Sequence, residues 1–314
     1  MSAMNTAVIG TGVIGAAWAS AFLTAGYDVT AWDPAEGAEE RLHDQIAKNL
    51  AVTDRLRDGT VETPPRGVLR FAETLADAVA GASFIQESGP ERLDLKQDLL
   101  AQIDAAAPAE ALIASSTSGF GPSSLAASAT AHPGRIVVGH PFNPAHLVPL
   151  VELVPGRDTP ADAVDRGLAF YREVGKKPIL VRAELPGHVT NRLQAALWQE
   201  AYSLVQRGVA SVADIDTAIA YGPGLRWSVL GPLALQHLSG GPGGMRHLLE
   251  HLGPPQEVWM HDLQKVHLDD GLTDTLVAGV DAELDGRDPA AMAEQRDEML
   301  VRLLALKAEF PDLR

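Results

Sequence analysis

The stretch at residues 6–33 constrains the fold more than any other part of this sequence. It opens with a short apolar run at 7–9, typical of a buried parallel strand, and turns through three glycines into an alanine-rich segment. That segment predicts a helix ending at Gly26. A second β-type run at 29–32 closes on Asp33. A strand, tight turn, helix and second strand in this order predict the start of a parallel α/β sheet.

The three glycines in this turn form the pattern GxGxxG. In dinucleotide-binding proteins the first glycine makes the turn, the second lets backbone approach the pyrophosphate, and the third lets helix and strand pack closely. The pattern alone is weak evidence in a chain with 29 glycines. Its position after a strand, at a helix start and about 20 residues before a carboxylate makes it specific. The cofactor contacts expected in this stretch are Gly10, Gly12, Val13, Ile14, Gly15 and Asp33.

Asp33 favours NAD over NADP as the cofactor. A carboxylate here accepts hydrogen bonds from the adenosine ribose and repels a 2′-phosphate. The next three residues, Pro34, Ala35 and Glu36, offer no compensating cation. The pyrophosphate is expected at the positive end of the helix that follows the glycines.

Length and composition favour a protein of about two domains with a sizeable core, because 46% of the 314 residues are hydrophobic. No run approaches the roughly 20 apolar residues of a membrane span, and no signal peptide is evident, so we expect no membrane partner. The chain has no cysteine, which excludes disulfides and thiol catalysis. This fits a reducing cytoplasm, where we expect the protein.

The formal net charge of −16 is spread along the chain without a Lys/Arg cluster. Nucleic acid is therefore not an expected partner. An acidic balance is compatible with a cationic or zwitterionic substrate, although it more often serves solubility.

Strand and helix patterns alternate up to about residue 184, which predicts a parallel sheet with helices on both faces. From residue 185 strand patterns stop and helical ones take over, so we predict a Rossmann-type doubly wound domain at 1–184 and an all-helical domain at 185–314. Further strands are expected at 68–71, 83–86, 111–114, 137–138, 150–154 and 179–181. Helices are expected at 38–50, 75–79, 93–105, 160–174, 189–206, 212–220, 233–238 and 292–308, with loops at 53–67 (Thr63-Pro64-Pro65) and 240–244.

Ligands bind beyond the carboxyl ends of such strands, which directs attention to residues 87–96, 115–120 and 140–144. Glu152 is an isolated charge in an apolar strand and needs a partner when buried, for which His140 is the obvious candidate. Histidine is a natural base near neutral pH, and a carboxylate on its other nitrogen fixes the tautomer. Ser118 and Asn191 could hold a substrate oxygen.

Each of these residues also has a simpler interpretation. His140, flanked by Gly and Pro, could be a turn or core residue, and Asn191 could cap a helix. Residues 115–118 could form an ordinary polar turn. His247 and His251 suggest a solvated helix face rather than a metal site, because no HExxH motif or dense ligand set accompanies them, and we expect no metal.

Five motifs in order resemble the L-3-hydroxyacyl-CoA dehydrogenase superfamily over nearly the whole chain: GTGVIG at 10–15, ASSTSGF at 114–120, GHPFNP at 139–144, PLVELV at 149–154 and GHVTNRL at 187–193. The resemblance implies a helical dimerisation domain after the Rossmann domain, and hence a homodimer. It implies His140 with Glu152 as the catalytic pair and Ser118 with Asn191 as contacts of the substrate oxygen. It places Glu91 and Lys96 on the nicotinamide side.

Within the superfamily the chain is more similar to the branch that contains L-carnitine dehydrogenase and lambda-crystallin (L-gulonate 3-dehydrogenase). FIQESGPERLDLK, AIAYGPGLRWSVLGP and GGMRHLLEHLGP carry this similarity. The acyl-CoA enzymes usually have an aromatic residue after the catalytic histidine, whereas this chain has Pro141. Residues 53–70 contain no lysine for the CoA phosphates, although Arg55, Arg57, Arg66 and Arg70 could replace one.

The segment most suited to selecting a substrate contains Arg226 and Trp227. Arg226 could bind a carboxylate in bidentate fashion, and Trp227, with Tyr221 or Trp198, could face a trimethylammonium group. Equally, Arg226 could pair with an acidic residue and Trp227 could be core.

We therefore predict NAD-dependent oxidation of a small polar 3-hydroxy acid, like L-carnitine or L-gulonate, to the 3-oxo acid. Ser116 is a further expected cofactor contact and Asn143 a further expected substrate contact. One alternative is a 3-hydroxyacyl thioester dehydrogenase. The other is a non-catalytic, crystallin-like protein that binds NAD.

Overall fold

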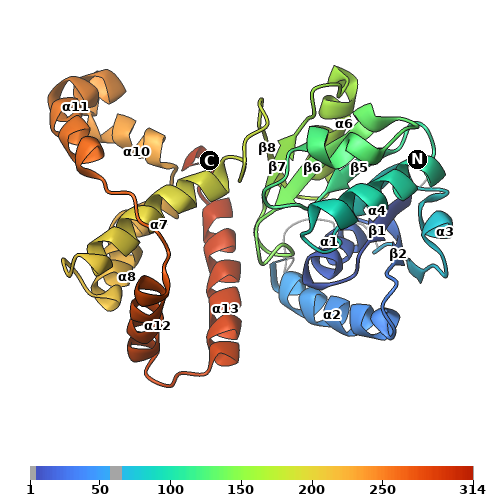
Figure 1. Cartoon of the computed structure of the whole chain (residues 1–314), viewed down its shortest axis with the longest axis horizontal. Helices are drawn as coiled ribbons and strands as arrows, with labels where there is room; N and C mark the ends of the chain where they lie inside the picture. Colours follow the sequence, from blue (N-terminus) through green and yellow to red (C-terminus); the bar gives the residue numbers. More distant parts are fainter. Residues whose placement is uncertain (1–4, 57–65, 314) are drawn as a thin grey trace. The chain divides into compact units, whose positions relative to one another are not determined.

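Figure 1 shows a computed structural model of the chain, which describes residues 5–56 and 66–313. The chain divides into two compact units, Met1–Arg192 and Leu193–Arg314. The boundary predicted after residue 184 falls inside the first unit, shortly before helix α7 (Thr190–Gln206) begins. The predicted loop at Thr63-Pro64-Pro65 lies outside the described residues.

The first unit is built on one eight-stranded sheet with the order β3-β2-β1-β4-β5-β6-β7-β8 (Figure 1). The sheet confirms the predicted doubly wound class, because β1 pairs in parallel with both β2 and β4. The strands are β1 Asn5–Ile9, β2 Asp28–Trp32, β3 Leu69–Phe71, β4 Phe84–Glu87, β5 Leu112–Ser115, β6 Ile136–Pro141, β7 Leu150–Val154 and β8 Lys177–Leu180.

The predicted parallel pairing is found from β3 to β6, whereas β7 runs antiparallel to β6. Residues 142–149 connect the two strands without a helix, and a connection this short can join antiparallel strands only. The register of this hairpin places His140 directly opposite Glu152.

Helices cover both faces of the sheet, as the alternating strand residues require. Val8 belongs to one buried cluster with Trp18 and Phe22 of α1, while Ile9 belongs to a second cluster with Leu100 of α4. The helices of this unit are α1 Val13–Thr24, α2 Ala38–Thr53, α3 Leu75–Val79, α4 Leu93–Ala106, α5 Pro122–Leu125 and α6 Ala161–Glu173, with short 3₁₀ turns at Asp54–Leu56, Ala126–Ser128 and Pro133–Arg135.

The second unit is helical in its described part, as predicted. The predicted helix ranges do not include α11 (Gly244–Asp262), which contains Pro254 and Pro255, or α12 (Asp270–Leu284), although a helix face was expected at His247 and His251 of α11. The remaining helices after α7 are α8 Val212–Tyr221, α9 Pro223–Trp227, α10 Pro232–Ser239 and α13 Pro289–Ala308, with 3₁₀ turns at Gly241–Gly243 and Pro311–Leu313. Among the described helices of the chain, none is long and apolar enough to cross a membrane.

Gly139 lies in β6 directly before His140, where the fold leaves no room for a side chain. The buried hydroxyl of Tyr171 donates to Gln86 Oε1 at 2.8 Å, and a Cβ at Gly139 would lie 1.8 Å from that hydroxyl. The Gln86 amide in turn donates to the Gly139 carbonyl at 3.3 Å. The strand that carries His140 is thus fixed against α6 and β4.

We predict that Gly139→Ala lowers the free energy of unfolding by about 1–3 kcal/mol, because the added methyl group must displace Tyr171 or the strand. Urea unfolding followed by circular dichroism measures the change. Gly81→Ala is the matched control, since its Cβ would meet only Asn5 Nδ2 at 3.8 Å. Equal losses in the two variants would contradict the packing argument.

Candidate functional site

The glycine-rich turn after β1 has the geometry that an approaching pyrophosphate requires. Gly10 has φ +88°, and a Cβ there would lie 2.7 Å from the Ser88 carbonyl carbon. A Cβ on Gly15 would lie 1.9 Å from the Gly10 oxygen, whereas one on Gly12 would meet nothing within 4 Å. Gly12 caps α1 without a side-chain hydrogen bond, and Val13 is exposed, so the helix start is open to an anion.

Asp33 follows β2 and lies beside this turn. Its Oδ2 accepts hydrogen bonds from the Thr11 amide at 2.7 Å and the Thr11 hydroxyl at 3.2 Å. Its Oδ1 accepts from the Ala35 amide at 2.9 Å. The carboxylate is therefore fixed at the position where the ribose of a dinucleotide is expected.

His140 and Glu152 form the central contact of the candidate site. His140 Nδ1 and Glu152 Oε2 are 2.7 Å apart, and the two side chains are 6% and 0% exposed. The other carboxylate oxygen accepts from the backbone amides of Val189 and Thr190, each at 2.9 Å. Glu152 thus uses both oxygens, which is how a buried carboxylate keeps its charge.

The pKa of Glu152 determines which tautomer His140 adopts. Burial alone raises this pKa, but the hydrogen bonds from His140, Thr190 and Val189 outweigh it and lower the pKa from 4.5 to about 2. Near neutral pH the carboxylate is therefore ionised and can only accept a hydrogen bond. A neutral His140 ring therefore donates through Nδ1, which leaves the lone pair of Nε2 free to take a proton.

His188 is a buried residue of this site that the sequence analysis did not single out. Its ring centroid lies 5.4 Å from that of His140, and its Nε2 is 3.4 Å from the Thr117 carbonyl. Burial, followed by the charge of His140, lowers the pKa of His188. It has φ +50°, an uncommon conformation that lies directly before the two amides bound to Glu152. No local sequence pattern indicates His188, because its place beside His140 depends on a contact between distant segments.

Ser118, Glu91 and Asn191 are brought together by the structure. Glu91 Oε1 accepts from the Ser118 amide at 2.8 Å, the Ser118 hydroxyl at 3.0 Å and the Thr117 hydroxyl at 2.7 Å. Burial raises the pKa of Glu91, but these bonds and Lys96 lower it overall. Asn191 Nδ2 donates to the Ser118 carbonyl at 3.0 Å.

Lys96 lies inside the protein rather than at the surface of the cofactor site. It is 1% exposed, and its ammonium lies 3.0 Å from Glu87 Oε1, with Glu91 farther away at 3.6 Å. Glu87 also accepts from the Ser115 hydroxyl at 2.5 Å. Glu87 begins the segment 87–96 that the sequence singled out, but its pairing with Lys96 was not predicted, because it depends on the contact between β4 and α4.

Ser116 is the centre of a polar cluster beneath the glycine-rich turn. Its hydroxyl accepts from Trp18 Nε1 at 3.1 Å and from Gln86 Nε2 at 2.9 Å, and lies 2.9 Å from the Ser88 hydroxyl. Gln86 thereby connects Ser116 with the Gly139 carbonyl, next to His140.

The remaining predicted residues are placed as follows. Asn143 is exposed in the 142–149 connection, before a cis peptide bond to Pro144. Arg226 and Trp227 belong to α9 of the helical unit, where they line a pocket of about 300 Å³. The pocket belongs to the second unit, whereas His140 belongs to the first.

Two of the arginines that could replace a lysine for CoA phosphates form ion pairs within the first unit. Arg66 pairs with Asp54 and Arg70 with Asp28 at 3.2 Å, while Arg57 lies outside the described residues. The rings of His247 and His251 stack 6.3 Å apart. In the described part of the chain, no group of three or more His, Asp or Glu could hold a metal ion.

Comparison with known proteins identifies relatives over the whole chain. Residues 5–184 match the family model for the 3-hydroxyacyl-CoA dehydrogenase NAD binding domain, and residues 187–275 match its C-terminal domain. L-carnitine dehydrogenase of Streptomyces griseus is 48% identical over 98% of this chain and 91% of its own length. L-carnitine dehydrogenase of Nocardiopsis dassonvillei is 49% identical over 95% and 89%.

Solved structures resemble the chain in fold. A 5-formyl-3-hydroxy-2-methylpyridine 4-carboxylic acid 5-dehydrogenase, described as an NAD⁺-dependent dismutase, superposes with a TM-score of 0.84 at 27% identity and covers 98% of this chain and 99% of its own. The (S)-3-hydroxybutyryl-CoA dehydrogenase of Ralstonia eutropha has a TM-score of 0.63 at 27% identity, with 80% and 87% covered.

We predict that Glu152 makes stability depend on acidity. Because its pKa falls from 4.5 to about 2 on folding, its contribution is complete above pH 4.5 and is lost as pH falls toward 2. Wild type should therefore lose its advantage in the free energy of unfolding over Glu152→Gln as the pH falls from 4.5 toward 2. The loss should reach about 3 kcal/mol. Urea unfolding at pH 6 and pH 3.5 measures the part of this loss that falls between these two pH values, about 1.4 kcal/mol.

Glu110→Gln is the control, since this exposed carboxylate should change the free energy of unfolding by less than about 0.5 kcal/mol. If the difference between wild type and Glu152→Gln were the same at both pH values, the ionised buried pair would be refuted.

Proposed function

Because the chain belongs to the 3-hydroxyacyl-CoA dehydrogenase family and is an NAD-dependent dehydrogenase of a 3-hydroxy acid, we propose that it oxidises a small, free, L-carnitine-like acid to the 3-oxo acid. The observation that carries the proposed oxidation step is the buried His140–Glu152 hydrogen bond of 2.7 Å, and the relatives named L-carnitine dehydrogenase support the substrate class. A dehydrogenase of this family is an enzyme, so the non-catalytic alternative is set aside.

His140 is the proposed base. Its Nε2 takes the hydroxyl proton of the substrate, while Glu152 stabilises the imidazolium that forms and keeps the ring oriented. NAD, when bound, supplies the acceptor for the hydride. The open helix start above Gly12 fits its pyrophosphate, since nothing lies within 4 Å of the position a Cβ would take.

Ser118 and Asn191 are proposed to hold the substrate oxygen as it becomes a carbonyl. The 3.0 Å hydrogen bond from Asn191 to the Ser118 backbone supports this, because it keeps the two side chains close together. Glu91 and Ser116 are proposed to line the cofactor, with Lys96 acting through Glu91 from inside the protein.

Arg226 and Trp227 are proposed to select the substrate. Arg226 suits a carboxylate and Trp227 a trimethylammonium group, and both line the same pocket, with Gln236 and Gln256. Asn143 is proposed as a further substrate contact. The relatives that are 48–49% identical and named L-carnitine dehydrogenase support this substrate class.

A 3-hydroxyacyl thioester remains the second candidate, because a structural relative is named for 3-hydroxybutyryl-CoA. The paired state of Arg66 and Arg70 favours the free acid, since each already binds a carboxylate of this chain.

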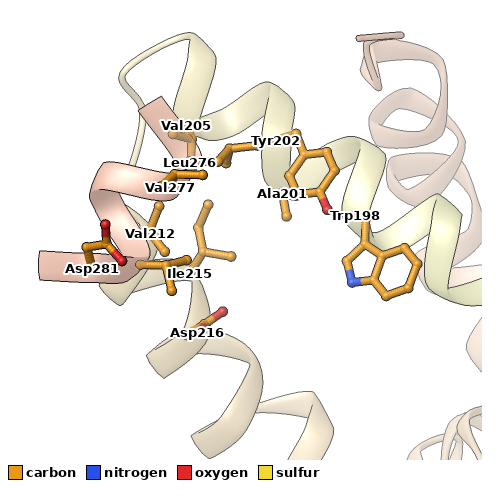
Figure 2. Close-up of a pocket in the computed structure, with 11 residues that line it drawn as sticks. Trp198, Ala201, Tyr202, Val205, Val212, Ile215, Asp216, Leu276, Val277 and Asp281 are labelled. Atoms are coloured by element: carbon orange, nitrogen blue, oxygen red, sulfur yellow. The ribbon is translucent and has the colours of Figure 1, made fainter. Parts of the chain in front are cut away.

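A homodimer is proposed from the apolar surface of the helical unit. Only Leu248, Leu272 and Val301 are buried hydrophobic residues among its described residues, so the unit has little core of its own. A groove of about 480 Å³ opens between α7, α8 and α12. Figure 2 shows Trp198 and Tyr202 of α7 facing this space, with Val277 on α12. Apolar surface of this extent is typical of an interface with a second copy.

We also propose a cytoplasmic location, where the NAD pool is accessible.

We predict a dimer in sedimentation velocity at micromolar concentration, and a shift toward monomer in Val277→Glu, because a buried carboxylate would be left unpaired in the groove. Val258→Glu is the control, since Val258 is similarly exposed (67% against 54%) and lies on α11 outside the groove. A monomeric wild type, or dissociation of both variants alike, would contradict the proposed interface.

We predict that His140→Ala lowers kcat by about 10³-fold or more and leaves the NADH dissociation constant nearly unchanged, because the histidine moves a proton and does not bind the cofactor. The assay follows NADH absorbance with L-carnitine, L-gulonate, L-3-hydroxybutyrate and L-3-hydroxybutyryl-CoA. Strong turnover of one free acid supports the proposal, and turnover of the thioester alone moves the function to the second candidate. Full activity of the variant would exclude His140 as the base.

A further inference from the structure

Lys176, between α6 and β8, is a buried cation with an unusual set of partners. It is 6% exposed, and in the part of the chain that the structure describes its ammonium forms no ion pair. Its hydrogen bonds go to the backbone carbonyls of Ala145 and of Val148, the latter at 3.1 Å. Burial lowers the pKa of Lys176 to about 8, so the side chain is still mostly protonated at pH 7.

A buried charge without a counter-ion is costly to keep. An apolar side chain of the same length would avoid this cost, but it would leave the buried carbonyl of Ala145 and the half-buried carbonyl of Val148 without this donor. The buried charge therefore serves to bind one segment, the connection at residues 142–149.

That connection joins the strands of His140 and Glu152 and carries Asn143. Inside it, the amides of Leu147 and Val148 both donate to the Pro144 carbonyl at 2.9 Å, which forms a compact turn. Lys176 donates to two carbonyls of this turn, those of Ala145 and Val148. Next to it, the Lys177 amide donates to Pro149 at 2.7 Å.

The same ammonium also faces Trp18 of α1, the helix that follows the glycine-rich turn. It lies 5.5 Å from the centre of the Trp18 ring, a cation–π distance. Trp18 Nε1 donates to Ser116, the centre of the polar cluster beneath the glycine-rich turn. Lys176 therefore touches both the substrate-side connection and the helix that follows the glycines.

We propose that Lys176 is a positioning residue, which fixes residues 142–149 through two carbonyls so that Asn143 is presented to the substrate beside His140. This inference rests on the proposed function, because the position of Asn143 matters only if a 3-hydroxy acid binds there. Lys176 itself touches neither substrate nor cofactor.

The test compares the full-length wild type with Lys176→Met, Lys176→Arg and, as a matched control, Lys177→Met. Lys177 is adjacent and exposed, and the structure uses its backbone amide. For Lys176→Met we expect KM for the 3-hydroxy acid to rise about 10-fold with a smaller change in kcat, and the NADH dissociation constant to stay within about 2-fold. Lys176→Arg should recover part of the loss, because it keeps the charge and the donors, and Lys177→Met should match wild type.

Amide hydrogen exchange provides a measurement that does not depend on activity. Peptides covering residues 142–149 should exchange about 10-fold faster in Lys176→Met than in wild type, with the sheet strands unchanged. If the wild type oxidised none of the acids, the proposed function would fail, while the exchange result would still decide whether Lys176 holds this connection.

Unchanged KM and unchanged exchange in a folded Lys176→Met protein would overturn the proposal. So would a Lys176→Met protein that fails to fold or loses NADH affinity in parallel with substrate affinity, because Lys176 would then support the fold in general.

Discussion

The hydrogen bond between His140 and Glu152 is the contact on which the rest of the candidate site depends. It joins residues that lie directly opposite each other on the antiparallel strands β6 and β7, and both residues are buried. A carboxylate remains ionised there because His140 binds one of its oxygens and the amides of Val189 and Thr190 bind the other. The start of α7 is therefore part of the same arrangement, and so is Asn191 that follows.

The sheet and its packing bring the remaining groups to this contact. Gly139 lets the hydroxyl of Tyr171 approach the strand, and Gln86 connects that strand with Ser116 at the cofactor side. Lys176 holds the connection on the other side of His140. The glycine-rich turn, the proposed base His140 and the proposed substrate contact Asn143 are thus connected to one sheet by buried polar bonds.

Much of the first unit was predictable from sequence because its buried strands and glycine-rich turn have strong local patterns. The direction of β7 was not predictable, because an apolar run shows neither which strand it pairs with nor whether the pairing is parallel. Helix α11 was hidden by Pro254 and Pro255, which usually end a helix. An isolated carboxylate in an apolar strand indicated that Glu152 needs a partner, but the roles of Glu87, His188 and Lys176 depend on contacts between distant segments that no local pattern reveals.

The most direct test of the account is the tautomer of His140, measured by ¹⁵N NMR on protein labelled at its ten histidines and assigned with His140→Gln. We predict that, in the neutral ring, Nδ1 carries the proton and Nε2 is bare, because an ionised Glu152 can only accept. A proton found on Nε2 instead would contradict the account, since His140 could not then take a proton from the substrate.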